Sequence, residues 1–168
     1  LETADVAALT TIQLRALETV DLQALSVQQV IALTTEQAEA LSTVQIKALT
    51  VGQIEALQTQ DIASLTSAQI VALGTEQIRA LGGAQVAALT TVQIQAMETV
   101  DISQLSATQL IALGSQQVQA LSTAQIVALK TEQVAAIEAL DLRALSSAQI
   151  RALETADIAA LSIEQVVA

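Results

Sequence analysis

The chain contains no Phe, Tyr, Trp, His, Cys or Pro, and it has a single Met. Without histidine it lacks the commonest general base and metal ligand, and without cysteine it has neither disulfides nor thiolate metal sites. An ordinary domain fills irregular interior space with large aromatic rings, whereas this chain has only Leu, Ile, Val and Ala for that purpose. These absences predict a thin, regular interior.

Positive charge is also scarce, since 6 Lys and Arg stand against 17 Asp and Glu, and the net charge is −11. Nucleic acid recognition needs cationic side chains for phosphates and aromatic rings for bases, and anionic membranes attract basic segments. The longest runs free of polar residues and Gly have four residues, as at 86–89, while a membrane-spanning helix needs about 20. We therefore expect no nucleic acid partner and no membrane insertion.

An eight-residue repeat fills the chain, because 168 residues divide into 21 octads without an insertion. With each octad cut before its Leu, position one is Leu in 19 octads, position six is Ile, Val or Leu in 20, and position eight is Ala in 19. Position five is Gln in 15 octads and Asp in 6, and all 23 charges fall on positions two, four, five and seven. Because charges avoid burial, we expect positions one, six and eight inside, position three sheltered, and positions four and seven in water. The whole of residues 1–168 is expected to form a single array.

The octad does not suit a continuous helix, since eight helical residues turn through about 800° and an apolar stripe would drift by about 80° per octad. The helix must stop and restart in each octad. Eleven octads carry Ser or Thr at position two followed by Gln at position five, as in Thr34 and Gln37, which is the capping box of a helix N-terminus. The alternative is a β-solenoid, because Thr, Ile and Val favour strands, but the apolar residues break two-residue alternation and most octads lack a turn residue. We predict an all-α solenoid of very short capped helices, one per octad, with the Gln as a cap or a stacked amide.

A longer period overlies the octads. Asp replaces Gln at positions 5, 21, 61, 101, 141 and 157, and the middle four are separated by five octads each. We favour a geometric or genealogical origin, in which five octads complete one or two coils or form the duplicated unit. The alternative is a calcium-binding column formed by Asp21, Asp61, Asp101 and Asp141, because calcium takes about six to eight oxygen ligands.

No catalytic constellation emerges from the sequence. The Ser residues have no candidate base beside them other than the carboxylates of the repeat, and a carboxylate pair that recurs with the repeat is typical of a surface or a cap. Gly82 and Gly83 form a Gly pair that lacks the rest of a phosphate loop. We expect no enzyme activity, no catalytic or cofactor-binding residue, no cofactor, and no metal apart from the calcium alternative.

Tandem phrases such as LTTEQAEAL at 33–41 and LTSAQIVAL at 65–73 resemble the octapeptide (ALTTxQIx) arrays of very large bacterial surface and secreted proteins, the adhesin-like group. The resemblance extends over all 21 octads. It implies an extracellular or cell-surface location and a structural or adhesive role, and it implies no individual functional residue.

Stacked octads bury a continuous aliphatic interior that no octad has alone. Terminal repeats in such folds usually carry a polar cap, yet LSIEQVVA at 161–168 is as apolar as the middle octads. We therefore expect that the array continues or that its ends stack on other copies, as in a self-associating filament, stalk or spacer. The alternative is a scaffold that binds another protein or a surface, although aromatic anchors are absent and Arg is sparse.

Overall fold

The computed structural model describes residues 2–167, and over that range the chain forms 21 short α-helices and no strand. One helix falls in each octad, which confirms the all-α prediction, and the β-solenoid alternative is wrong. The helices are α1 (Thr3–Ala8), α2 (Thr11–Ala16), α3 (Thr19–Gln23), α4 (Val27–Ile31), α5 (Thr35–Ala40), α6 (Thr43–Ala48), α7 (Val51–Ala56), α8 (Thr59–Ser64), α9 (Ser67–Ala72), α10 (Thr75–Ala80), α11 (Gly83–Ala88), α12 (Thr91–Ala96), α13 (Thr99–Ile102), α14 (Ala107–Ile111), α15 (Ser115–Ala120), α16 (Thr123–Ala128), α17 (Thr131–Ala136), α18 (Ala139–Leu142), α19 (Ser147–Ala152), α20 (Thr155–Ala160) and α21 (Ile163–Val167).

Each octad consists of two extended residues followed by a short helix. Before α7, Leu49 and Thr50 are extended, with ψ angles of 136° and 159°. The backbone N–H of Gln53 donates to Thr50 Oγ1 (3.2 Å), and the backbone N–H of Thr50 donates to Gln53 Oε1 (2.9 Å). The same reciprocal cap begins all eleven helices that have Ser or Thr at position two. The restart signal predicted from the sequence is therefore confirmed.

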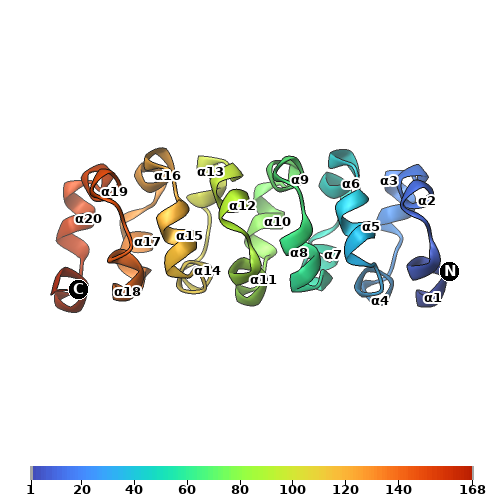
Figure 1. Cartoon of the computed structure of the whole chain (residues 1–168), viewed down its shortest axis with the longest axis horizontal. Coiled ribbons are helices and arrows are strands. Elements are labelled where there is room, and N and C mark those ends of the chain that lie inside the picture. Colours follow the sequence, from blue (N-terminus) through green and yellow to red (C-terminus); the bar gives the residue numbers. More distant parts are fainter. Residues whose placement is uncertain (1, 168) are drawn as a thin grey trace.

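The helices stack into turns of three, because each helix packs against the third helix after it throughout the described chain. Three octads therefore make approximately one three-sided turn. The turns form an elongated rod with the two ends of the chain far apart (Figure 1). We name the three faces of the rod by one member each. The α10 face consists of α1, α4, α7, α10, α13, α16 and α19. The α11 face consists of α2, α5, α8, α11, α14, α17 and α20. The α12 face consists of α3, α6, α9, α12, α15, α18 and α21.

Three octads per turn corrects one expectation from the sequence. Five octads complete about one and two-thirds turns, not one or two coils. The reason is geometric, because each extended pair of residues makes one corner after each short helix, and three corners close the triangle. The five-octad period therefore does not coincide with a whole number of turns.

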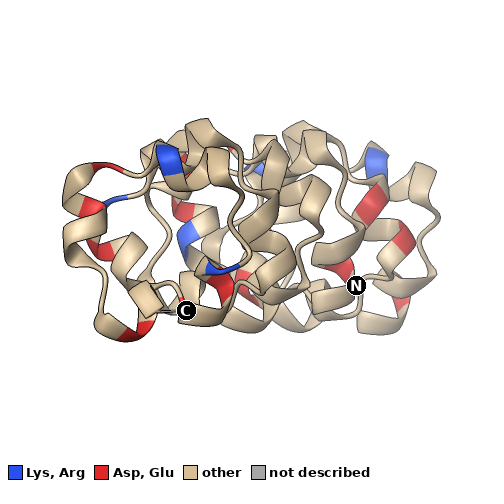
Figure 2. Ribbon diagram, turned by 60° about the vertical axis from the view of Figure 1, so that its left-hand side comes forward, with Lys and Arg blue, Asp and Glu red and all other residues tan. Residues whose placement is uncertain are grey.

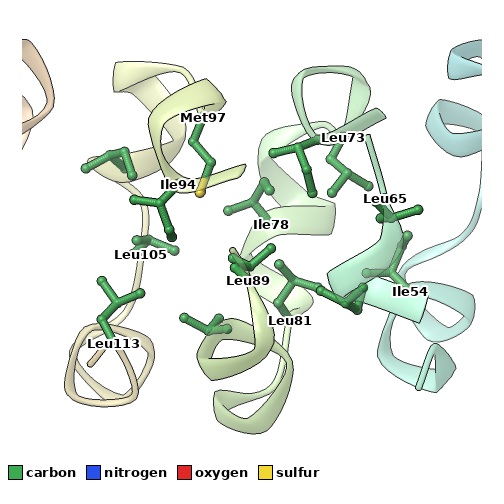
Figure 3. Close-up of a cluster of buried hydrophobic side chains, with 14 of the residues drawn as sticks. Ile54, Leu65, Leu73, Ile78, Leu81, Leu89, Ile94, Met97, Leu105 and Leu113 are labelled. Atoms are coloured by element: carbon green, nitrogen blue, oxygen red, sulfur yellow. The ribbon is translucent and has the colours of Figure 1, made fainter. Parts of the chain in front are cut away.

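The interior is a continuous column of aliphatic side chains from positions one and six. Ile54, Ile78 and Leu89 are buried, and Figure 3 shows side chains from successive turns pointing toward one another around Ile78, Leu81 and Leu89. Burying one such side chain contributes roughly 1.5–3 kcal/mol, and an octad achieves it only beside the neighbouring turns.

Two details of the predicted pattern are wrong. Ala at position eight is mostly half-buried instead of interior, and position three is more often exposed than sheltered. Position three is the first helical residue, and the cap does not use its side chain, because the residues at positions two and five bond to each other.

Candidate functional site

A buried Gln at position five joins each turn of the rod to the preceding turn. Gln93 Oε1 accepts a hydrogen bond from the backbone N–H of Thr90 (2.7 Å) at the start of its own helix. Its Nε2 donates to the backbone oxygens of Ile62 (2.8 Å) and Leu65 (2.6 Å), at the end of α8 in the preceding turn. Both helix ends have backbone groups without intrahelical partners, so one amide caps two helices.

The same Gln bridge recurs along the rod, with backbone oxygens 28 and 31 residues earlier as acceptors. It is made by Gln37, Gln45, Gln53, Gln69, Gln77, Gln85, Gln93, Gln109, Gln117, Gln125, Gln133 and Gln149. The predicted capping role is confirmed. The stacked-amide alternative is wrong, because the amides bond to backbone groups and not to one another.

Asp at position five joins the turns differently. Asp61 Oδ2 accepts from the backbone N–H of Gln58 (3.2 Å), so the cap on its own helix is kept, while Oδ1 accepts from the hydroxyl of Thr35 (3.1 Å) in the preceding turn. Three more hydroxyls donate in the same way to an Asp 26 residues later: Thr75 to Asp101, Ser115 to Asp141 and Thr131 to Asp157. A carboxylate has no N–H and is shorter than a Gln side chain, so it does not bond to the carbonyl groups of the preceding helix.

These hydroxyl partners of the Asp residues were not predicted from the sequence. A signal for them exists, because all four Asp residues with a preceding turn follow a Ser or Thr by 26 residues, whereas Gln53 and Gln77 follow Val27 and Val51 by the same interval. The signal is weak, since Ser or Thr occupies position three in 15 of the 21 octads.

Burial raises the pKa of two of these carboxyl groups, Asp61 and Asp101, above the ordinary value of an Asp. The hydroxyl bonds from Thr35 and Thr75 oppose the rise in pKa without cancelling it, and the neighbouring Glu98 carboxylate raises the pKa of Asp101 further. The ionised form of each group is therefore less favourable in the folded rod than in water.

The four Asp residues of the calcium alternative do not form a column. Asp21, Asp61, Asp101 and Asp141 lie on α3, α8, α13 and α18, so neighbours along the series are separated by about one and two-thirds turns and lie on different faces. Within residues 2–167 no three Asp or Glu side chains lie close enough together to hold a metal ion. The calcium alternative assumed one column, because the sequence does not give the number of octads per turn. That the chain takes no metal and no cofactor stays a prediction.

A shallow hollow of about 440 Å³ opens beside Asp101 and is also lined by Lys47, Leu73, Thr75 and Glu98. It brings two carboxylates and one ammonium group to one place. Its hydroxyl–carboxylate pair, Thr75 with Asp101, is the same contact between turns that recurs at Asp61, Asp141 and Asp157, which is typical of a structural joint. The geometry of the rod thus directs attention to its joints and outer faces.

The corner of the rod is a recurring run of six residues, from position eight of one octad to position five of the next. In ALTTVQ at 88–93, Ala88 ends α11, Leu89 is extended, Thr90 caps α12, and Gln93 makes the bridge. The model of a family described as the ALTTAQ repeat matches residues 1–35, 16–51, 54–91, 94–131 and 134–168. The chain belongs to the ALTTAQ repeat family. The six letters of that description correspond to the corner and its bridging Gln.

Three of the family matches in this ALTTAQ array, those beginning at positions 54, 94 and 134, start five octads apart, the spacing also seen between the middle Asp residues. No curated protein matches the chain at a significant level. No helix within residues 2–167 combines the length and the apolar character that crossing a bilayer requires.

Proposed function

We propose that this ALTTAQ array is an extracellular structural segment, a stalk, spacer or filament of a bacterial surface protein, and that its ends stack on copies of itself. The observation that carries the proposal is the joint between turns. A Gln or Asp bond to the preceding turn is present in every octad from α5 to α20, and buried aliphatic side chains pack beside these bonds along the middle of the rod. Such a design sets length and stiffness.

The two end faces of the rod are complementary halves of this joint. At the last turn Ile150 and Ile158 are 42% and 45% exposed, whereas their equivalent Ile78 in the middle is 1% exposed. A hollow of about 460 Å³ opens there among Leu145, Ile150, Leu153, Ile158 and Leu161. An uncovered aliphatic surface of this kind favours a partner.

The first turn presents the other half of the joint. Asp5, Gln13 and Asp21 are exposed there, while most position-five residues further along are buried against the preceding turn. In a head-to-tail stack, Gln13 of one copy would lie over the end of α19 in the next copy. Its amide could then donate to backbone oxygens there, as the amide of Gln93 does at the end of α8. Head-to-tail contacts that do not close on themselves generate filaments, and further octads of a longer array would fit the same faces.

The end-to-end proposal is tested by electron microscopy and sedimentation of the chain at increasing concentration. We expect fibres whose length grows with concentration, and loss of fibres in Ile158→Glu, which places a carboxylate on the last turn. Ile12→Glu, on the exposed side of α2, is the matched control and should leave the fibres intact. Rods that stay single at every concentration would contradict end stacking.

The extracellular location rests on the resemblance of the octads to bacterial surface arrays. It is tested by protease treatment of intact cells that produce the chain, where digestion of the array before lysis is expected. Protection of the array until lysis would contradict it. A scaffold that binds another protein is less well supported, since the chain has no aromatic residue to act as an anchor.

A further inference from the structure

The three outer faces carry similar numbers of charged residues, but they differ in how many uncharged helices follow one another. On the α12 face, the successive helices α9, α12 and α15 and the two residues leading into each carry no charged side chain. Within the described chain the α11 face has two successive uncharged helices, α11 and α14, and the α10 face has none in succession. Figure 2 shows the charged residues scattered over the rod with long uncharged stretches of ribbon between them.

The same face carries a row of exposed aliphatic side chains at position four. Val20, Val44, Val92 and Leu140 are between 61% and 66% exposed, and Val71 at position seven adds to the row. The members lie one or two turns apart on α3, α6, α9, α12 and α18, which pack in sequence along the rod. Val71 and Val92 lie in the uncharged middle of this face, whereas the helices of Val20, Val44 and Leu140 also carry charged residues, as do most helices of the other two faces.

We propose that the α12 face is a lateral contact between two copies of this chain. A second copy carries the same net charge of −11, so two rods repel each other wherever carboxylates meet. The uncharged middle of the α12 face is the place where that repulsion is least.

The chemistry of the face also suits a second copy better than an unrelated partner. Between the aliphatic residues lie exposed hydroxyl and amide groups, Thr90, Thr91, Gln95, Gln116 and Gln119. Hydroxyl and amide groups both donate and accept hydrogen bonds, so two such surfaces satisfy each other. A cationic or anionic partner would find no opposite charge in the middle of this face.

The size of the face sets the strength of the contact. From α6 to α18 there are four helix spacings, about 32–40 Å in total at the usual 8–10 Å per spacing, and a six-residue helix is about 9 Å long. The projected area is roughly 300–360 Å² per copy, below the roughly 800 Å² per partner of a stable complex. Two isolated copies should therefore pair weakly. The row passes from the upper edge at α6 and α9 toward the front at α12 and α15 (Figure 1), so paired rods would wrap around each other.

The lateral contact is independent of end stacking, because it uses the side of the rod and no residue of the end faces. The lateral contact joins two copies only, whereas end stacking can add further copies without limit. The test is therefore made in the Ile158→Glu background, in which end stacking is removed. Sedimentation velocity of this variant up to millimolar concentration should show a reversible shift from monomer to dimer.

The decisive comparison is between two double variants, one with two added carboxylates in the aliphatic row and one with two added carboxylates on the other two faces. Val44→Glu/Val92→Glu should keep the chain monomeric over the whole concentration range. Ile12→Glu/Ala124→Glu adds the same charge at position four of the other two faces and should dimerise like the background variant. Monomer at every concentration in the background variant, or equal loss of dimer in both double variants, would overturn the proposal.

A second readout uses the absence of cysteine from the chain. Both parallel and antiparallel two-fold pairing about the uncharged stretch place α12 against α12. Val92→Cys should therefore form a disulfide-linked dimer under mild oxidation, well beyond the yield from Ile12→Cys on the α11 face. Equal yields from the two variants would contradict the contact, and circular dichroism of each variant checks that the helices are retained.

Discussion

At the scale of single residues, the choice between Gln and Asp at position five decides how strongly two turns are joined. A Gln such as Gln93 caps its own helix and also donates to two backbone oxygens of a helix in the preceding turn. An Asp such as Asp101 instead accepts one hydroxyl bond from Thr75, and it buries a carboxylate whose pKa is raised. The Asp joints are therefore the weaker ones in the rod.

Replacing Asp101 by Gln should stabilise the rod. The new amide would be placed to donate to the backbone oxygens of Ile70 and Leu73, 31 and 28 residues earlier, as at the other Gln positions. Two new hydrogen bonds of about 1 kcal/mol each, less the lost bond from Thr75, give an expected gain of about 1 kcal/mol. The measurement is the free energy of unfolding in urea at neutral pH.

The reverse substitution provides the matched controls. Gln93→Asp loses the bonds to the backbone oxygens of Ile62 and Leu65. The new carboxylate can accept a hydrogen bond from the hydroxyl of Ser67, which precedes it by 26 residues, as Thr75 precedes Asp101. In Gln77→Asp the corresponding place is occupied by Val51, which has no hydroxyl. Both should destabilise the rod, Gln93→Asp by about 1 kcal/mol and Gln77→Asp by more, since a buried acceptor without a partner costs about 1–3 kcal/mol. Equal losses would show that the hydroxyl partner is unimportant.

The buried carboxyl groups also predict a pH dependence. Because the pKa values of Asp61 and Asp101 are raised in the folded rod, the folded state holds these protons more tightly than the unfolded state does. Their contribution to stability is complete below the unfolded pKa and is lost as the pH rises through the folded pKa. Lowering the pH from neutral toward the ordinary carboxyl range should therefore raise the unfolding temperature.

The variant Asp61→Asn/Asp101→Asn separates this effect from the general relief of negative charge in acid. It should show a smaller rise in unfolding temperature between pH 7 and pH 5, as followed by circular dichroism. An unchanged slope would mean that the rest of the net charge of −11 accounts for the whole dependence.

At the scale of the element, an octad helix is far too short to be stable alone. Isolated helices shorter than about 12–15 residues are marginal in water, and these have between four and six residues. Caps and packing therefore supply their stability. The helices that follow Gly74, Gly82 and Gly114 begin without a side-chain oxygen at the cap.

Gly82→Ser should stabilise the rod by about 0.5–1 kcal/mol, from the added cap and from reduced freedom of the unfolded chain. Gly82 has φ of −69° and ψ of 158°, values that Ser26 and Ser42 share. An added Cβ would meet only Gln85 Oε1 at 3.7 Å. Thermal unfolding measures the gain, Thr50→Gly should show the corresponding loss, and a destabilised Gly82→Ser would contradict the role of the cap.

The octad helix is predictable from sequence because its determinants are close together. Thr34 and Gln37 are three residues apart, and the confinement of charges to four positions marks the inner side. The turn of three octads is not predictable in the same way. The hydrogen bonds that define the turn join residues 26 to 31 positions apart. Because the octads are nearly alike, the sequence does not indicate which octad packs on which other octad. The buried Gln could be foreseen, but the acceptors of its amide N–H groups could not.

At the scale of the whole molecule, the rod behaves as a sum of similar joints. In linear repeat proteins each unit contacts only its neighbours, and stability grows with the number of units. Here the unit of stacking is the turn, since helices contact the third one along. The chain can therefore vary in length without loss of its interior, provided that each octad still lies over another octad in the same phase.

Insertion of a second copy of residues 65–88 directly after residue 88 tests this property. It adds one turn, so the rod should lengthen by about 8–10 Å, and Asp101 would again lie over a copy of Thr75. The unfolding temperature should be equal or higher. Insertion of a second copy of residues 65–76, which is one and a half octads, places positions one and six outside in part of the chain and should lower the unfolding temperature sharply. Small-angle scattering gives the length of both variants. If both insertions were tolerated equally, the phase of the octads would not control the stacking, and the joint described above could not be what holds the rod together.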